Sequence, residues 1–108
     1  MRDAGDCRFE RLDKYLSTMR KGLHLVVSGV VQGVGFRWFV LRAANRYGVK
    51  GYVKNRFDGA VETYAEGDES SLRAFFDEVR VGPSHAHVAA VNYNWVEYKG
   101  NYTEFRIE

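Results

Sequence analysis

The segment Gly29–Arg37, which reads GVVQGVGFR, holds the residue types that most clearly suggest chemistry. Glycine-rich loops that lead into a helix commonly bind anions, because their bare N–H groups and the positive end of the helix dipole point at one spot. Such a loop can also be a plain strand-to-helix turn. Arg37 would lie in the first helical turn, where a cation opposes the dipole unless an anion sits between them. The segment therefore favours an anion-binding loop, with a plain turn as the alternative.

Two common phosphate-binding loops do not fit this segment. A P-loop ends in Gly-Lys-Ser or Gly-Lys-Thr, whereas this loop ends in Gly35-Phe36-Arg37. The dinucleotide-binding fingerprint needs a third glycine where Trp38 stands and an acidic residue about twenty positions later, where Asn55 stands. What remains is a generic nest of backbone N–H groups that turn toward one anion. The residues expected to form it are Gln32, Gly33, Val34, Gly35 and Phe36.

The residues around this loop predict a strand before it and a helix after it. HLVVSG, residues 24–29, reads as a strand that ends at the glycines. From Phe36 onward, apolar residues fall on one helical face, and Gly48 is a natural end for that helix. Trp38 is either a surface aromatic of this helix or a cover over the loop. The apolar face consists of Phe36, Phe39, Val40, Ala43 and Tyr47.

A hairpin and a second helix follow. VKGYVKN, residues 49–55, and AVETYAEG, residues 60–67, read as strands joined by a turn at Asp58-Gly59. Asp68 can cap a helix that Gly82-Pro83 ends. The apolar face of that helix consists of Leu72, Phe75, Phe76 and Val79.

The last part of the chain predicts a long strand over residues 87–98 and a short one over residues 102–108. The element order is then βαββαβ plus one strand, the split arrangement of ferredoxin-like α+β domains. We expect an antiparallel sheet with a fifth, short C-terminal strand and with both helices on one face. The helical crossover makes the first two strands run in the same direction, so both end at one edge of the sheet. Gly33, Arg37 and Asn55 should converge there.

Length and composition fit one small domain and exclude several classes of protein. The chain has 108 residues, of which 45% are hydrophobic, and a net charge of +2 without a long basic run. That charge suits a small anionic ligand better than a nucleic acid. Cys7 is the only cysteine, and the pair His85 and His87 has no third partner in view, so neither a disulfide nor a metal site is expected. No apolar run is long enough to cross a membrane, so we expect a cytoplasmic protein. We also expect a monomer that holds no metal ion and no cofactor.

Residues 1–22 differ from the rest of the chain. They are rich in charge and sparse in apolar side chains. We expect a flexible N-terminal extension before a domain at residues 23–108. A docked helix is the alternative, because four apolar residues fall near a helical period, namely Phe9, Leu12, Leu16 and Met19.

Two stretches of the chain resemble the signature stretches of acylphosphatases. One is GVVQGVGFR, and the other is GYVKNRFDGAVETYAEG at residues 51–67. Both are long and stand in the right order. The resemblance runs from about His24 to Ile107 and leaves the N-terminal extension outside. The position of Gly35 varies within that family, and the positions that matter for chemistry show no departure.

The resemblance implies an enzyme that hydrolyses acyl phosphates to a carboxylate and inorganic phosphate, with no metal ion and no phosphoenzyme. It implies that Arg37 binds the phosphoryl group together with the loop amides, and that Asn55 positions the attacking water. An amide cannot take a proton from that water. No histidine or carboxylate in the two motifs is an obvious base, so we expect oxygens of the substrate to accept the proton.

Two other functions remain open at this stage. KGYVKNRF, residues 50–57, partly resembles the RNP1 stretch of RNA-binding modules, although Val53 replaces a small residue and Lys54 replaces the stacking aromatic. A non-catalytic domain that binds phosphate or another anion for regulation is the second alternative. Turnover of an acyl phosphate would separate both from an enzyme.

Overall fold

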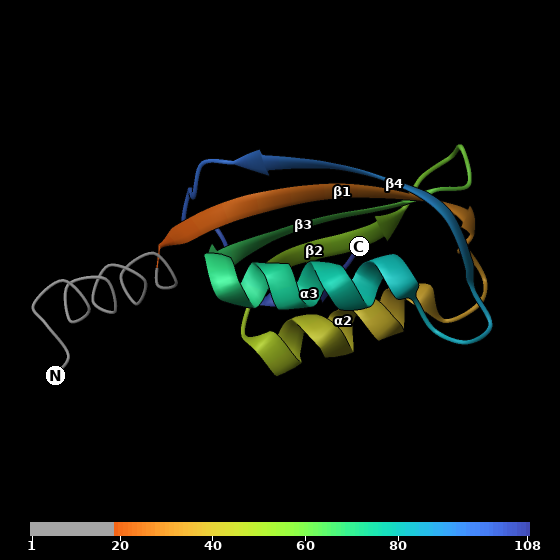
Figure 1. Cartoon of the computed structure of the whole chain (residues 1–108), viewed down its shortest axis with the longest axis horizontal. Coiled ribbons are helices and arrows are strands. Elements are labelled where there is room, and N and C mark those ends of the chain that lie inside the picture. The colour runs from red at the N-terminus through yellow and green to blue at the C-terminus, as the bar shows by residue number, and fades with distance from the viewer. Residues whose placement is uncertain (1–18) are drawn as a thin grey trace, which may run out of the picture.

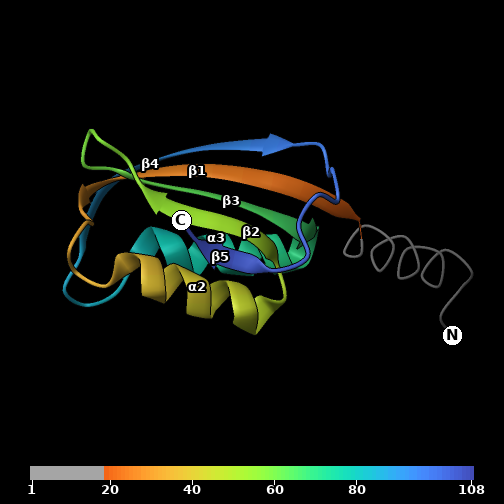
Figure 2. The same ribbon diagram turned by 180° about the vertical axis from the view of Figure 1, so that it is seen from behind.

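The structure, a computed structural model, describes residues 19–108 and consists of a sheet layer and a helix layer (Figure 1). Figure 2 shows from behind that both helices cover the same face of the sheet. The strand order is β4-β1-β3-β2-β5. The elements are β1 (Arg20–Val30), α2 (Phe36–Tyr47), β2 (Lys50–Asn55), β3 (Val61–Asp68), α3 (Glu69–Val81), β4 (His87–Val96) and β5 (Phe105–Ile107).

Strand directions place the ends of β1 and β2 at one edge of the sheet. Both strands pair antiparallel with β3, so they run in the same direction, as predicted. The predicted antiparallel sheet is confirmed for β1 to β4, and the predicted fifth strand, β5, differs in direction, because it pairs parallel with β2 through Gly51 and Phe105. The reason is the path of the chain. Strand β4 ends beside the start of β1, where Val96 pairs with Gly22, and residues 97–104 reach the start of β2 without crossing the length of the sheet.

Strand bounds differ from the prediction at both ends of the domain. Strand β1 begins at Arg20 and not at residue 24, because its pairing with β3 continues to the pair Arg20 and Asp68. Residues 20–22 of the expected extension are therefore strand. Strand β4 ends at Val96, where its pairing with β1 ends, two residues before the expected end. Residues 1–18, with Cys7 among them, lie outside the described residues.

The core lies between the sheet and the two helices. Leu23, Leu25 and Val27 alternate along β1 and are fully buried against the helices. Burying side chains of this size stabilises a fold by about 1.5–3 kcal/mol each. The predicted helical faces supply the other layer, although Phe39, Tyr47 and Phe76 are only half-buried there. The buried helical residues are Phe36, Val40, Ala43, Ala44, Leu72, Phe75 and Val79.

Glycines set the ends of the helices, as expected, but the predicted cap of the second helix is wrong in one respect. Gly48 ends α2 in the left-handed conformation with φ 72°. Asp68 is the N-cap residue of α3, yet its side chain makes no capping hydrogen bond. The N–H of Glu69 donates instead to the Met19 carbonyl oxygen at 2.8 Å. The Asp68 carboxylate lies 3.8 Å from the Arg20 guanidinium, an ion pair that competes with capping.

Candidate active site

A pocket of about 150 Å³ lies where β1 and β2 end. Residues 31–35, the glycine loop, connect β1 to α2, and Asn55 is the last residue of β2. The structure thus brings together the three residues that the topology predicts to converge, although more than twenty positions separate Gly33 from Asn55. The pocket is lined by Val31, Gly33, Gly35, Phe36, Arg37, Trp38 and Asn55.

The three glycines of the first motif, Gly29, Gly33 and Gly35, have two different structural roles. Gly33 and Gly35 have φ 77° and 79°, and a Cβ on either would meet no atom within 4 Å. The left-handed backbone, which costs other L-residues about 1–2 kcal/mol, therefore requires glycine at these positions. Gly29 lies at a bulge against β4, where a Cβ would come within 2.1 Å of the His87 carbonyl oxygen. Only Gly33 and Gly35 shape the pocket.

Gln32 ties the two motifs together. Its side-chain amide donates to the Arg56 carbonyl oxygen at 2.7 Å and to the Ala60 carbonyl oxygen at 2.9 Å. These bonds hold the glycine loop against the turn that follows Asn55. Of the predicted loop residues, Gly33, Gly35 and Phe36 line the pocket, whereas Gln32 and the half-buried Val34 do not. The pairing of Gln32 with two distant carbonyls has no signal in the sequence.

Arg37 brings a positive charge to the pocket. No Asp or Glu side chain among residues 19–108 forms an ion pair with it, and the first turn of α2 holds no acidic residue. Its Nη1 lies 3.4 Å from the main-chain oxygen of Glu108, while the N–H of Glu108 donates to the Val53 carbonyl oxygen at 2.8 Å. The guanidinium and the N-terminal end of α2 both attract an anion.

Asn55 offers a free side-chain amide at the same pocket. It is exposed, and within residues 19–108 its side chain makes no hydrogen bond. An amide with both a donor and an acceptor available can orient a water molecule.

Asp58 is the carboxylate nearest to Asn55 along the chain, and its geometry is that of a turn residue. It accepts a hydrogen bond from the Ala60 N–H at 3.1 Å and one from Arg56 at 3.0 Å. The hydrogen bond from Ala60, with that from Arg56, holds the pKa of the Asp58 carboxyl below its ordinary value. Both bonds make this carboxylate a weaker base, and it does not line the pocket.

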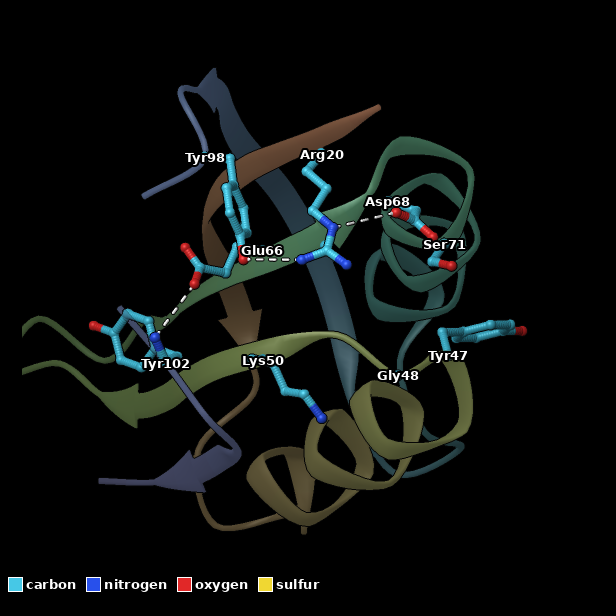
Figure 3. A pocket seen from close by; sticks show the side chains of 10 residues that line it. Arg20, Tyr47, Gly48, Lys50, Glu66, Asp68, Ser71, Tyr98 and Tyr102 are labelled. Atoms are coloured by element: carbon cyan, nitrogen blue, oxygen red, sulfur yellow. Dashed lines mark hydrogen bonds and ion pairs between the residues drawn. The ribbon is translucent and has the colours of Figure 1, made fainter. Parts of the chain in front are cut away.

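A second cavity, of about 250 Å³, lies at the other end of the sheet (Figure 3). Its floor is the buried carboxylate of Glu66, which accepts from the Tyr64 hydroxyl at 2.9 Å and from the backbone N–H groups of Gly100 and Tyr102, each at 3.3 Å. Arg20 contacts Asp68 and the Tyr98 hydroxyl. The polar side chains of this cavity therefore bond mainly to one another. Through its bonds to Gly100 and Tyr102, Glu66 holds the segment that leads to β5.

Three further kinds of site or segment find no support in the described part of the chain. Residues 19–108 hold no group of three or more His, Cys, Asp or Glu side chains placed to bind a metal ion. None of the helices in that range is long and apolar enough to cross a membrane. The RNP1-like segment also fails as an RNA platform, because Val53 is buried and Phe57 lies in the hairpin turn and not on the sheet.

Fold and pocket together define a ferredoxin-like α+β domain with a cationic, glycine-lined pocket at one sheet edge. Comparison with known proteins gives the family. The acylphosphatase family model matches residues 23–107. An acylphosphatase of Caldanaerobacter subterraneus subsp. tengcongensis is 45% identical over 89 residues, which is 82% of this chain and 99% of that protein. An acylphosphatase of Thermotoga maritima is 49% identical over 88 residues, or 82% of this chain and 97% of that protein.

A solved structure agrees with the sequence comparisons. The crystal structure of acylphosphatase from Bacillus subtilis matches with a TM-score of 0.79 and 37% identity, and the match covers 83% of this chain and 99% of that one. The chain belongs to the acylphosphatase family.

Proposed function

We propose that this protein hydrolyses the carboxyl–phosphate bond of acyl phosphates, giving a carboxylate and inorganic phosphate, without a metal ion. The observation that carries the proposal is the meeting of Arg37, Asn55 and two left-handed glycines at one pocket. The names of the relatives support the same reaction.

Arg37 and the glycine loop hold the phosphoryl group. A planar guanidinium can bond two phosphate oxygens at once and stays charged at working pH. Backbone N–H groups near Gly33, Gly35 and Phe36 cover the remaining oxygens, at the N-terminal end of α2. Gln32 and Val34 complete the loop, and Gln32 acts through its bonds to the Asn55 hairpin. An acyl phosphate has a good leaving group, so catalysis rests mainly on positioning and charge.

Asn55 orients the attacking water. Its amide cannot accept the proton of that water, and Asp58 is engaged in the turn. The proton therefore passes to an oxygen of the substrate. The reaction needs no cofactor, and its only partners are the acyl phosphate and the phosphate product.

The finer features of the protein follow from the same proposal. Residues 19–108 form the catalytic domain, since β1 begins at Arg20, and the reaction does not need residues 1–18. One chain supplies Arg37, Asn55 and both loop glycines, so the site needs no second copy and we expect a monomer. We also place the protein in the cytoplasm.

The test is hydrolysis of benzoyl phosphate in the presence of EDTA. Wild-type protein should turn over, and Arg37→Ala should lower kcat/KM by about 10²–10³-fold and weaken inhibition by inorganic phosphate. Arg42→Ala is the matched control, because Arg42 is an exposed arginine of the same helix outside the pocket. Activity that EDTA abolishes would contradict a metal-independent reaction. No wild-type turnover, with phosphate still bound, would make the protein an anion-binding domain.

A further inference from the structure

Trp38 lies on the wall of the pocket and presents most of its indole to solvent. It follows Arg37 in the first turn of α2, lines the pocket with Arg37 and Asn55, and is 61% exposed. Within residues 19–108 its ring packs on no other aromatic ring and on no cation. Single exposed apolar residues are ordinary on protein surfaces. This one differs because it borders the only described pocket that holds Arg37.

The pocket is too small to enclose a whole acyl phosphate with a large acyl group. A volume of about 150 Å³ takes a phosphoryl group and few further atoms. Pockets that enclose a whole drug-sized ligand measure roughly 300–1,000 Å³. The acyl group of a substrate held by Arg37 therefore extends past the pocket and meets whichever side chain forms the rim.

Two large apolar side chains compete for that contact. Phe57, which is fully exposed, borders a separate and shallower depression of about 530 Å³ that includes Asn55 but neither Arg37 nor Trp38. In phosphoryl transfer the attacking and leaving oxygens stand roughly in line, on opposite sides of the phosphorus. Since Asn55 holds the water, the leaving acyl group points away from Asn55 and its hairpin. Trp38 is the large exposed apolar side chain on the wall of the Arg37 pocket that does not belong to this hairpin.

We propose that the Trp38 indole packs against the acyl group of the substrate and makes the enzyme prefer acyl phosphates with aromatic or other large apolar acyl groups over acetyl phosphate. The inference rests on the proposed function and adds the substrate class. Trp38 touches no reacting atom, so it determines specificity and takes no part in the bond changes.

The experiment compares kcat/KM for benzoyl phosphate with kcat/KM for acetyl phosphate. Trp38→Ala should lower the ratio of the two values by about 3- to 10-fold, mainly through a higher KM for benzoyl phosphate. Trp38→Phe should keep most of the wild-type ratio, because a phenyl ring can also stack on the acyl group. Phe57→Ala is the matched control and should leave the ratio as in the wild type.

Each outcome decides the matter. A ratio that Trp38→Ala leaves unchanged, or one that falls in Phe57→Ala instead, overturns the inference while the proposed function stands. A wild type that hydrolyses neither substrate overturns both. Binding is measured separately by fluorescence in Trp95→Phe, a variant in which Trp38 is the only tryptophan. Benzoylphosphonate should change the fluorescence of that variant saturably, and the absence of any change would contradict the contact.

Discussion

Arg37 stands where a purely structural helix tends to avoid a cation, in the first turn of α2 and without an acidic neighbour in that turn. Asn55 ends a strand with an unused amide. Neither residue is explained by the packing of the fold. The proposed phosphoryl group accounts for both residues, because it neutralises Arg37 and is attacked by the water that Asn55 orients.

Asp58 tests at the residue scale whether the reaction uses a protein base. Asp58→Asn removes the charge but keeps an oxygen that can accept from the Ala60 N–H. We expect benzoyl phosphate turnover within about fivefold of the wild type, since losing a true general base costs about 10²–10⁴-fold. A loss in that larger range would mean that Asp58 takes the proton and that the substrate-assisted route is wrong.

At the scale of elements, the sheet sets the geometry that the loops use. The two site segments meet because β1 and β2 both run antiparallel to β3. Gln32 then joins the glycine loop to the hairpin through two carbonyl oxygens. The outer face of the sheet is stabilised separately, by hydrogen bonds to Glu62 from His24 at 2.9 Å and from the Tyr52 hydroxyl at 2.8 Å.

Glu62 gives a pH-dependent prediction for this face. The hydrogen bond from His24, with that from Tyr52, lowers the pKa of the Glu62 carboxyl below its ordinary value of 4.5. A carboxyl whose pKa is lowered by folding adds stability above its unfolded pKa and loses it as pH falls through the folded value. Glu62→Gln should therefore lower the free energy of unfolding by about 1 kcal/mol at pH 7. The difference should shrink below about pH 4.

Urea unfolding at a series of pH values measures this effect. Glu97→Gln is the control, because Glu97 is exposed and its side chain makes no hydrogen bond in the described part of the chain. Equal destabilisation of Glu62→Gln at pH 3 and pH 7 would show that the carboxylate charge contributes nothing.

The order and type of the elements follow from the sequence because they depend on local period, and the meeting of Arg37 and Asn55 at one pocket follows because it depends on chain direction. Features that depend on distant partners do not follow. The parallel pairing of β5 depends on where residues 97–104 pass, and the start of β1 at Arg20 depends on how far β3 extends. The bonds of Gln32 join positions more than twenty residues apart, and nothing local predicts them.

At the scale of the whole molecule, the pocket with Arg37 and the second cavity, which contains Glu66, lie at opposite ends of the sheet. The N-terminal end of β1 lies at the end of the sheet that holds the Glu66 cavity. Three contacts made there are the bond from Glu69 N–H to the Met19 carbonyl and the ion pairs Arg20–Asp68 and Lys21–Glu69. Residues 19–22 should therefore contribute to stability and not to catalysis.

Two truncated chains separate these roles. A chain that begins at Met19 should keep both the activity and the melting temperature of the full chain. A chain that begins at Leu23 should keep kcat but lose about 1–2 kcal/mol of stability, because it lacks the contacts of residues 19–22. Thermal unfolding and benzoyl phosphate hydrolysis measure the two properties. A large loss of kcat in the chain that begins at Met19 would show that the extension takes part in catalysis.

The division of labour between Arg37 and Asn55 is the central claim, and Asn55→Ala tests it most directly. The measurement is kcat for benzoyl phosphate together with the inhibition constant of inorganic phosphate, with Asn92→Ala as an exposed asparagine control. We predict that kcat falls by about 10²–10³-fold while the inhibition constant of phosphate stays within about threefold of the wild type. A variant that keeps its kcat, or one that loses phosphate binding along with it, would contradict the assignment of Asn55 to the water.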